Sequence, residues 1–137
     1  MFGSCKSLES IDLSSNYISN VKNMEFMFLG CSSLKSLDLS KFNTSSVIDM
    51  KEMFSGCKQL KSLNLSNFNT INVESMFKMF MDFTDLISLD ISSFDASSLM
   101  VVEYMFSGCS SLISLIYQIL KNHFLVVYKE CFLDVLI

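Results

Sequence analysis

The sequence predicts an α/β solenoid in which short parallel strands and short helices alternate, with about 26 residues in each unit. The dipeptide Met-Phe recurs every 26 residues, at positions 1, 27, 53, 79 and 105. A second column with the same spacing holds Cys5, Cys31, Cys57, Phe83 and Cys109. A fixed period of roughly 20 to 50 residues is typical of a solenoid, because each unit is one supersecondary element that stacks on the next.

Composition and charge exclude several classes of protein. Half of the 137 residues are hydrophobic, which is enough apolar material for the core of one domain. The net charge of -4 argues against nucleic-acid binding, because that function needs a basic patch. We expect no transmembrane segment, since no stretch holds the roughly 18 uncharged apolar residues of a membrane span. The chain shows no signal peptide and begins within a unit, so we expect it to belong to a longer array.

The first half of each unit predicts a short strand. In the second unit, polar and apolar residues alternate over residues 36–40, which is the pattern of a half-buried strand. Leu37 and Leu39 are expected to face the core, and the polar residues between and beside them are expected to face outward. The Asn, Thr and Ser residues at 43–46 then predict a turn.

The second half of each unit predicts a short helix. Apolar residues recur at spacings of three and four between residues 47 and 57, as they do on one face of a helix. Ser46 and Asp49 resemble an N-terminal capping box, and Gly56 is expected to end the helix because it tolerates positive φ. Neither half can bury its apolar face alone, so the units are expected to stack.

The repeated phrase MFxGCxxLxSLxLSxFNT, at residues 27–44 and 53–70, resembles the BspA-like class of leucine-rich repeat surface proteins. The resemblance covers residues 1 to about 116 and includes the LxxLxL core of that repeat, Leu34, Leu37 and Leu39. It implies a curved leucine-rich-repeat solenoid with strands on the concave face and helices on the convex face. It also implies a cell-surface or secreted location, and a role in adhesion or protein–protein interaction without catalysis.

Two parts are predicted in the chain. Residues 1–116 form the leucine-rich-repeat array, incomplete at its N-terminus, and residues 117–137 form a divergent apolar segment without Ser or Gly. Apolar residues in this segment recur at spacings of three and four, which fits a helix that caps the last strand edge of the array. The alternative is a stretch foreign to the repeat that packs poorly.

Stacking the predicted strands would align their outward residues into three polar rows, and these rows are the candidate ligand-binding site. They consist of Ser10, Asp12, Ser14, Ser36, Asp38, Ser40, Ser62, Asn64, Ser66, Ser88, Asp90 and Ser92. Aligned hydroxyl and carboxylate groups offer many hydrogen bonds to a protein or glycan partner. Two other interpretations stay open. The rows could be a solvated face that binds nothing, or a calcium site, although calcium needs converging oxygens and a flat row diverges.

No catalytic residue, metal site or cofactor is predicted. The cysteine column accepts Phe83, so its thiols fit buried packing positions better than zinc or redox sites. Cys131 lies outside the column, and His123 has no partner in a recognisable nucleophile arrangement. We therefore expect a non-catalytic module of a cell-surface array that recognises a protein or surface ligand. The alternative is a structural spacer, or a truncated repeat fragment with no binding activity of its own.

Overall fold

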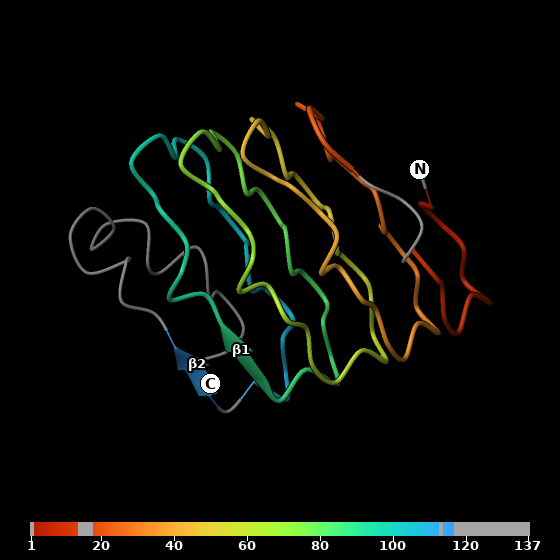
Figure 1. Ribbon diagram of the computed structural model, residues 1–137. Helices are drawn as coiled ribbons and strands as arrows, with labels where there is room; N and C mark the ends of the chain where they lie inside the picture. The colour runs from red at the N-terminus through yellow and green to blue at the C-terminus, as the bar shows by residue number, and fades with distance from the viewer. Residues whose placement is uncertain (1, 14–17, 113, 117–137) are drawn as a thin grey trace.

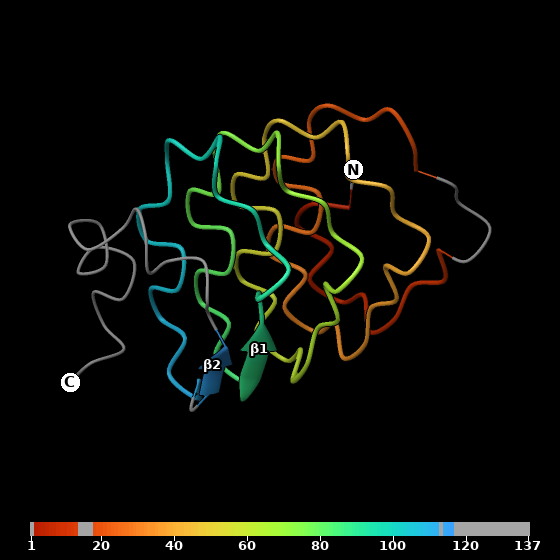
Figure 2. The same cartoon turned by 60° about the vertical axis from the view of Figure 1, so that its left-hand side comes forward.

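The computed structural model describes residues 2–13, 18–112 and 114–116. The chain winds through successive coils that lie side by side, from the N-terminal coil at one end to residues 114–116 near the other (Figures 1 and 2). Parallel backbone pairs join residues 26 positions apart in adjacent coils: Asn23 with Asp49, Asp49 with Ser75, and Ser75 with Val101. The contacts between coils therefore repeat with the period of the sequence.

The predicted α/β class and the leucine-rich-repeat solenoid are wrong. The described residues contain no helix, and their strands are β1 (Ser88–Asp90) and β2 (Ser114–Ile116), which pair in parallel with Ser88 beside Ser114. Turns and irregular coil make up nearly all of the rest of the described chain. The predicted arrangement, with parallel strands along one face and helices along the other, does not form.

The predicted helix over residues 47–57 is replaced by consecutive turns. The N–H of Met53 donates to the carbonyl oxygen of Met50 at 3.2 Å, three residues back where a helix would reach four. Glu52, the third residue of this turn, has a φ of 50°, and Gly56 has a φ of 76° at the same place in the next turn. Positive φ at the third residue is the geometry of a type II turn and does not occur in a right-handed helix. The predicted capping box therefore caps no helix, whereas the positive φ expected of the glycine is confirmed.

Alternate N–H groups of these turns join each coil to the next. The N–H of Phe28 donates to the carbonyl oxygen of Met53 at 2.9 Å, and the N–H of Phe54 donates to that of Met79 at 3.1 Å. Met53 and Phe54 share one peptide group, so this group accepts from the coil before it and donates to the coil after it. The bonds thus form a continuous string of peptide groups. Three further strings of this kind run through the N–H groups of Met24, Phe26 and Gly30.

The segments predicted as strands keep the predicted alternation of buried and exposed residues. In residues 62–66, the side chains of Leu63 and Leu65 are 8% and 1% exposed, and their polar neighbours are exposed. Among the described residues, a single backbone hydrogen bond, from the N–H of Lys35 to the carbonyl oxygen of Glu9, joins the first two segments of this kind. No regular ladder forms there, which is why these segments are not strands.

A column of stacked aromatic rings fills the centre of the coils. The ring of Phe54 lies 5.7 Å from that of Phe28 and 5.8 Å from that of Phe80, with interplanar angles of 1° and 6°. All three rings are fully buried, and burying such a side chain contributes about 1.5–3 kcal/mol. The repeated Met-Phe dipeptide therefore marks the residues that stack one coil on the next.

The cysteine column lies beside the rings. Cys31, Cys57 and Cys109 are buried, as predicted, and the thiol of Cys57 donates to the carbonyl oxygen of Phe28 at 3.3 Å. Cys5, in the first coil, is exposed, so the prediction of a buried packing position is wrong there. Buried thiols of this column act as small apolar side chains with one weak hydrogen bond each.

The C-terminal segment is not part of the described structure. The capping helix predicted over residues 117–137, with Cys131 and His123, lies outside the described residues. The part of the chain that is described has no helix with the length and apolar character needed to cross a membrane.

Candidate recognition surface

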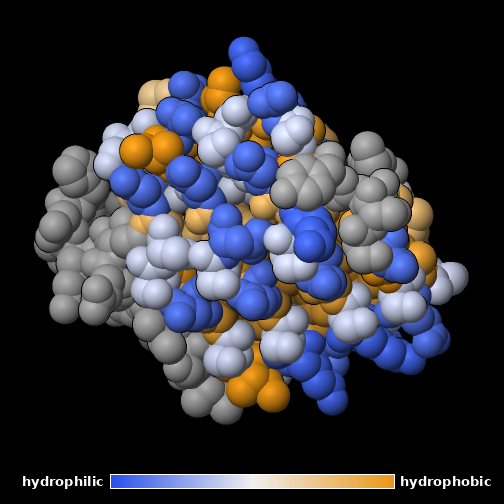
Figure 3. Space-filling view, in the orientation of Figure 1, coloured by the Kyte–Doolittle hydropathy of each residue, from blue (hydrophilic) through white to orange (hydrophobic). Residues whose placement is uncertain are grey.

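The polar rows predicted from the sequence are exposed on the described coils and are called the Ser/Asp face below. Its described members are Ser10, Asp12, Ser36, Asp38, Ser40, Ser62, Asn64, Ser66, Ser88, Asp90 and Ser92, and all are exposed. Ser14 lies outside the described residues. Buried or half-buried apolar residues alternate with these positions and fix which way each side chain points. In Figure 3, hydrophilic side chains cover most of the visible face in rows that cross the coils.

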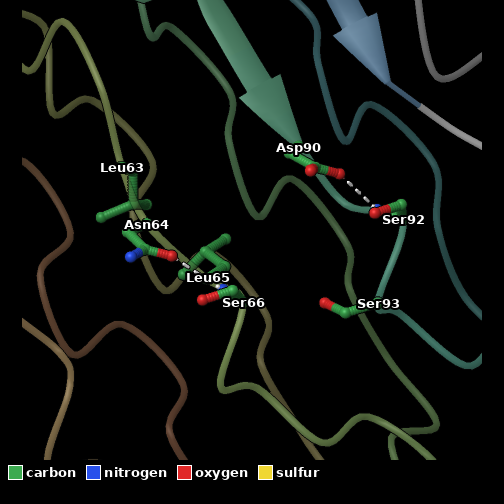
Figure 4. Close-up of a pocket in the computed structure, with 7 residues that line it drawn as sticks. All are labelled: Leu63, Asn64, Leu65, Ser66, Asp90, Ser92 and Ser93. Carbon is green, nitrogen blue, oxygen red and sulfur yellow. Dashed lines mark hydrogen bonds between the residues drawn. The ribbon is translucent and has the colours of Figure 1, made fainter.

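In three of the coils, the central residue of the Ser/Asp face closes a local turn. Its side-chain oxygen Oδ1 accepts the backbone N–H two residues on, which is an Asx turn. Three of these bonds are described: from Ser40 to Asp38 at 2.9 Å, from Ser66 to Asn64 at 3.0 Å, and from Ser92 to Asp90 at 2.8 Å. Figure 4 shows the last two. The central oxygens are therefore held in place before any partner binds.

These turns also set the charge of the face. The backbone N–H and the hydroxyl of Ser40 lower the pKa of Asp38, because both donate to its carboxylate. The hydroxyl and the N–H of Ser92 lower the pKa of Asp90 in the same way. Both carboxylates are ionised at neutral pH. The Ser/Asp face thus presents fixed negative charges separated by hydroxyl groups.

A shallow hollow of about 90 Å³ lies on this face between two coils. Figure 4 shows Asn64 and Ser66 on one coil, and Asp90, Ser92 and Ser93 on the next, on the two sides of the gap. Pockets for drug-sized ligands measure roughly 300–1,000 Å³. The hollow therefore suits a few water molecules or a small polar group of a partner, as a contact within a larger flat interface.

The buried thiols and the acidic side chains of the described chain form neither a nucleophilic site nor a metal site. Burial raises the pKa of Cys57 and of Cys109 to about 12, so these thiols stay protonated at neutral pH and are poor nucleophiles. Among the described residues, no three His, Cys, Asp or Glu side chains gather closely enough to hold a metal ion.

Two buried threonines, which the sequence indicated only as turn residues, join neighbouring coils. The hydroxyl of Thr44 donates to the carbonyl oxygen of Asn69 at 3.0 Å and accepts its N–H at 2.8 Å. The hydroxyl of Thr70 makes the same two bonds with Asp95, at 2.9 and 2.7 Å. Both threonines are 1% exposed. The recurrence of Phe-Asn-Thr with the period of the units was the signal that could have indicated an inward role.

A second feature that sequence reasoning missed is a row of left-handed residues, called the flank row below. Phe26, Glu52, Lys78 and Tyr104 occupy the same place in four successive coils, with φ of 57°, 50°, 53° and 58°. None is a glycine, although glycine adopts this conformation most easily. The four residue types differ, so the column leaves no visible repeat in the sequence.

The comparisons with known proteins identify one family. A family model described as a Mycoplasma protein of unknown function, DUF285, matches residues 1–118. Neither the curated proteins nor the solved structures contain a match to the chain. The match covers most of the sequence, and the chain therefore belongs to the DUF285 family.

Proposed function

We propose that this member of the DUF285 family is a non-catalytic recognition module that binds a protein or glycan partner through its Ser/Asp face. The observation that carries the proposal is the regular row of exposed polar side chains whose central oxygens are fixed by Asx turns. A group that is already ordered loses little conformational entropy when a partner binds. Aligned hydroxyls and carboxylates can then both donate and accept hydrogen bonds.

The size of the face argues that one chain binds weakly. Four coils, each about 4.8 Å wide, and about five residues along each, give roughly 300 Å². A standard interface buries roughly 800 Å² on each partner. The resemblance of the repeated phrase to the BspA-like class supports a longer cell-surface or secreted array, in which many such faces would act together.

The test removes charge from the face and keeps its turns. Asp38→Asn with Asp90→Asn retains the Oδ1 acceptor, as Asn64 does naturally at the same place. Asp95→Asn is the matched control, because Asp95 makes the same kind of turn with Ser97 at 2.8 Å outside the Ser/Asp face.

Binding would be screened on a printed glycan array and on a panel of purified cell-surface ectodomains. For any partner found, we expect the double variant to bind at least about tenfold more weakly, and the control to bind like wild type. Equal binding by all three proteins would remove the Ser/Asp face from consideration. Absence of any partner for the wild-type chain would favour the alternative role as a structural spacer.

A further inference from the structure

We propose that a second copy of this chain docks on the flank row, in an antiparallel pair with two-fold symmetry. The row presents Phe26, Glu52, Lys78 and Tyr104 in that order along the stack, on turns separate from the Ser/Asp face. Phe26 is 36% exposed and Tyr104 is 37% exposed, so part of each aromatic ring is available to a partner. The surface thus has an aromatic ring at each end and two opposite charges between them.

Both charges remain available to a partner. Glu52 and Lys78 are neighbours in the row, yet these two described side chains form no ion pair with each other. The Nζ of Lys78 instead lies 5.0 Å from the ring centre of Phe77 and 5.8 Å from that of Tyr104. These cation–π contacts hold the ammonium group along the surface, where it can still meet a carboxylate.

The order of residues in the row is self-complementary when one copy is reversed. An axis between Glu52 and Lys78 places Glu52 of one copy against Lys78 of the other, and Lys78 against Glu52. The same axis places Phe26 against the Tyr104 of the second copy. A two-fold interface requires this kind of complementarity, because the same patch must fit itself. A parallel pair would set Glu52 against Glu52 and Lys78 against Lys78, which is unfavourable.

The residues one position before the flank row form a second column, and the centre of this column fits the same reversed arrangement. The column consists of Glu25, Lys51, Phe77 and Glu103. Lys51 lies 5.3 Å from the ring centre of Phe26 and 5.8 Å from that of Phe77 within its own chain. In the antiparallel pair it faces Phe77 of the second copy, which adds a cation–π contact across the interface. The column also brings Glu25 near Glu103 of the second copy. The two-fold axis makes two such acidic pairs, one at each end of the face, where water and salt screen them.

Apolar surface beside the flank row adds area to the contact. Ile48, Met100 and Val101 are 37%, 70% and 37% exposed, and each lies a few residues before the flank row in its coil. Four coils spaced by about 5 Å and a width of about 15 Å still give only roughly 300 Å² on each copy. This is less than the roughly 800 Å² of a stable interface. We therefore expect weak, reversible association with a Kd of about 0.1–1 mM.

The test is a charge exchange followed by sedimentation equilibrium of the full chain. Glu52→Lys and Lys78→Glu should each weaken self-association at least about tenfold, because like charges then meet across the axis. The double variant Glu52→Lys with Lys78→Glu should regain it. Mixing the two single variants should give mixed pairs, since every charge then meets its opposite. Lys61→Glu, at an exposed position outside the flank row, is the control and should associate like wild type.

Recovery on mixing separates the proposal from simple damage to the fold, because a misfolded variant would not be rescued by another. A wild-type chain that is monomeric at about 1 mM would overturn the proposal. So would single variants that associate like wild type, or single variants that stay apart when mixed. None of these outcomes affects binding at the Ser/Asp face, so the two proposals fail independently.

Discussion

Replacing Thr70 with valine removes the hydroxyl that joins two coils and keeps the branched shape of the side chain. The hydroxyl of Thr70 donates to the carbonyl oxygen of Asp95 at 2.9 Å and accepts the N–H of the same residue at 2.7 Å. Each hydrogen bond contributes about 0.5–1.5 kcal/mol net, and a buried group left without its partner costs about 1–3 kcal/mol. We therefore expect Thr70→Val to lower the free energy of unfolding by about 2–3 kcal/mol.

Thr70→Ser is the matched control for this variant. It keeps the hydroxyl and loses one methyl group, which costs about 0.8 kcal/mol for the lost burial. Urea unfolding followed by far-UV circular dichroism gives both free energies. Hydrogen exchange of the Asp95 amide gives a local measure, with faster exchange expected only in the valine variant. The reasoning is refuted if Thr70→Val is as stable as wild type, or if Thr70→Ser is the less stable of the two variants.

Three further predictions concern the core and the turns. Phe54→Ala should lower the free energy of unfolding, measured in urea melts, by about 3–5 kcal/mol, because the fully buried ring of Phe54 stacks on both neighbouring rings. A smaller loss than in a surface Ala variant would contradict the stacked column. Gly108→Ala should lower the thermal stability of the chain, since the φ of Gly108 is 75° and an added Cβ would clash with Oδ1 of Asp82. Adding Asp82→Gly should recover part of the lost thermal stability. No recovery would count against this clash. Iodoacetamide at pH 8 should label Cys5 and spare Cys57 in the folded chain. In the unfolded chain the Cys57 thiol has its ordinary pKa of 9.0, whereas in the folded chain burial raises this pKa to about 12. The free energy of unfolding should therefore fall as the pH rises from 9.0 to about 12, and it should fall less steeply in Cys57→Ala.

The sequence predicted which residues face inward more accurately than the elements that hold them there. Apolar residues at spacings of three and four are buried between residues 47 and 57, as expected, but consecutive turns place them there. Such turns and an α-helix bury residues at similar intervals, so spacing alone cannot separate them. The positive φ values that do separate them fall on Glu52 and Lys78, residues that give no sign of a left-handed conformation.

The described residues of the Ser/Asp face are exposed, because the alternation over residues 36–40 and 62–66 survives without a regular strand ladder. What the sequence did not indicate was the local role of Asp38 and Asp90, whose carboxylates close turns as well as face solvent. The flank row could not be predicted at all. Its members come together only through the winding of the chain, and no single residue type marks the column.

The four strings of peptide groups give the side of the stack along which they run an electrical direction, whereas bonds elsewhere, such as that from the N–H of Glu74 to the carbonyl oxygen of Ile48, run the other way. Every N–H in them points towards the following coil and every carbonyl towards the preceding one, as the bonds from Phe28 to Met53 and from Phe54 to Met79 show. Each peptide carries a dipole of about 3.5 D, and aligned dipoles add. The partial negative charge therefore gathers at the N-terminal end and the partial positive charge at the opposite end. An added carboxylate should therefore be stabilising at the C-terminal end of these strings and destabilising at their N-terminal end.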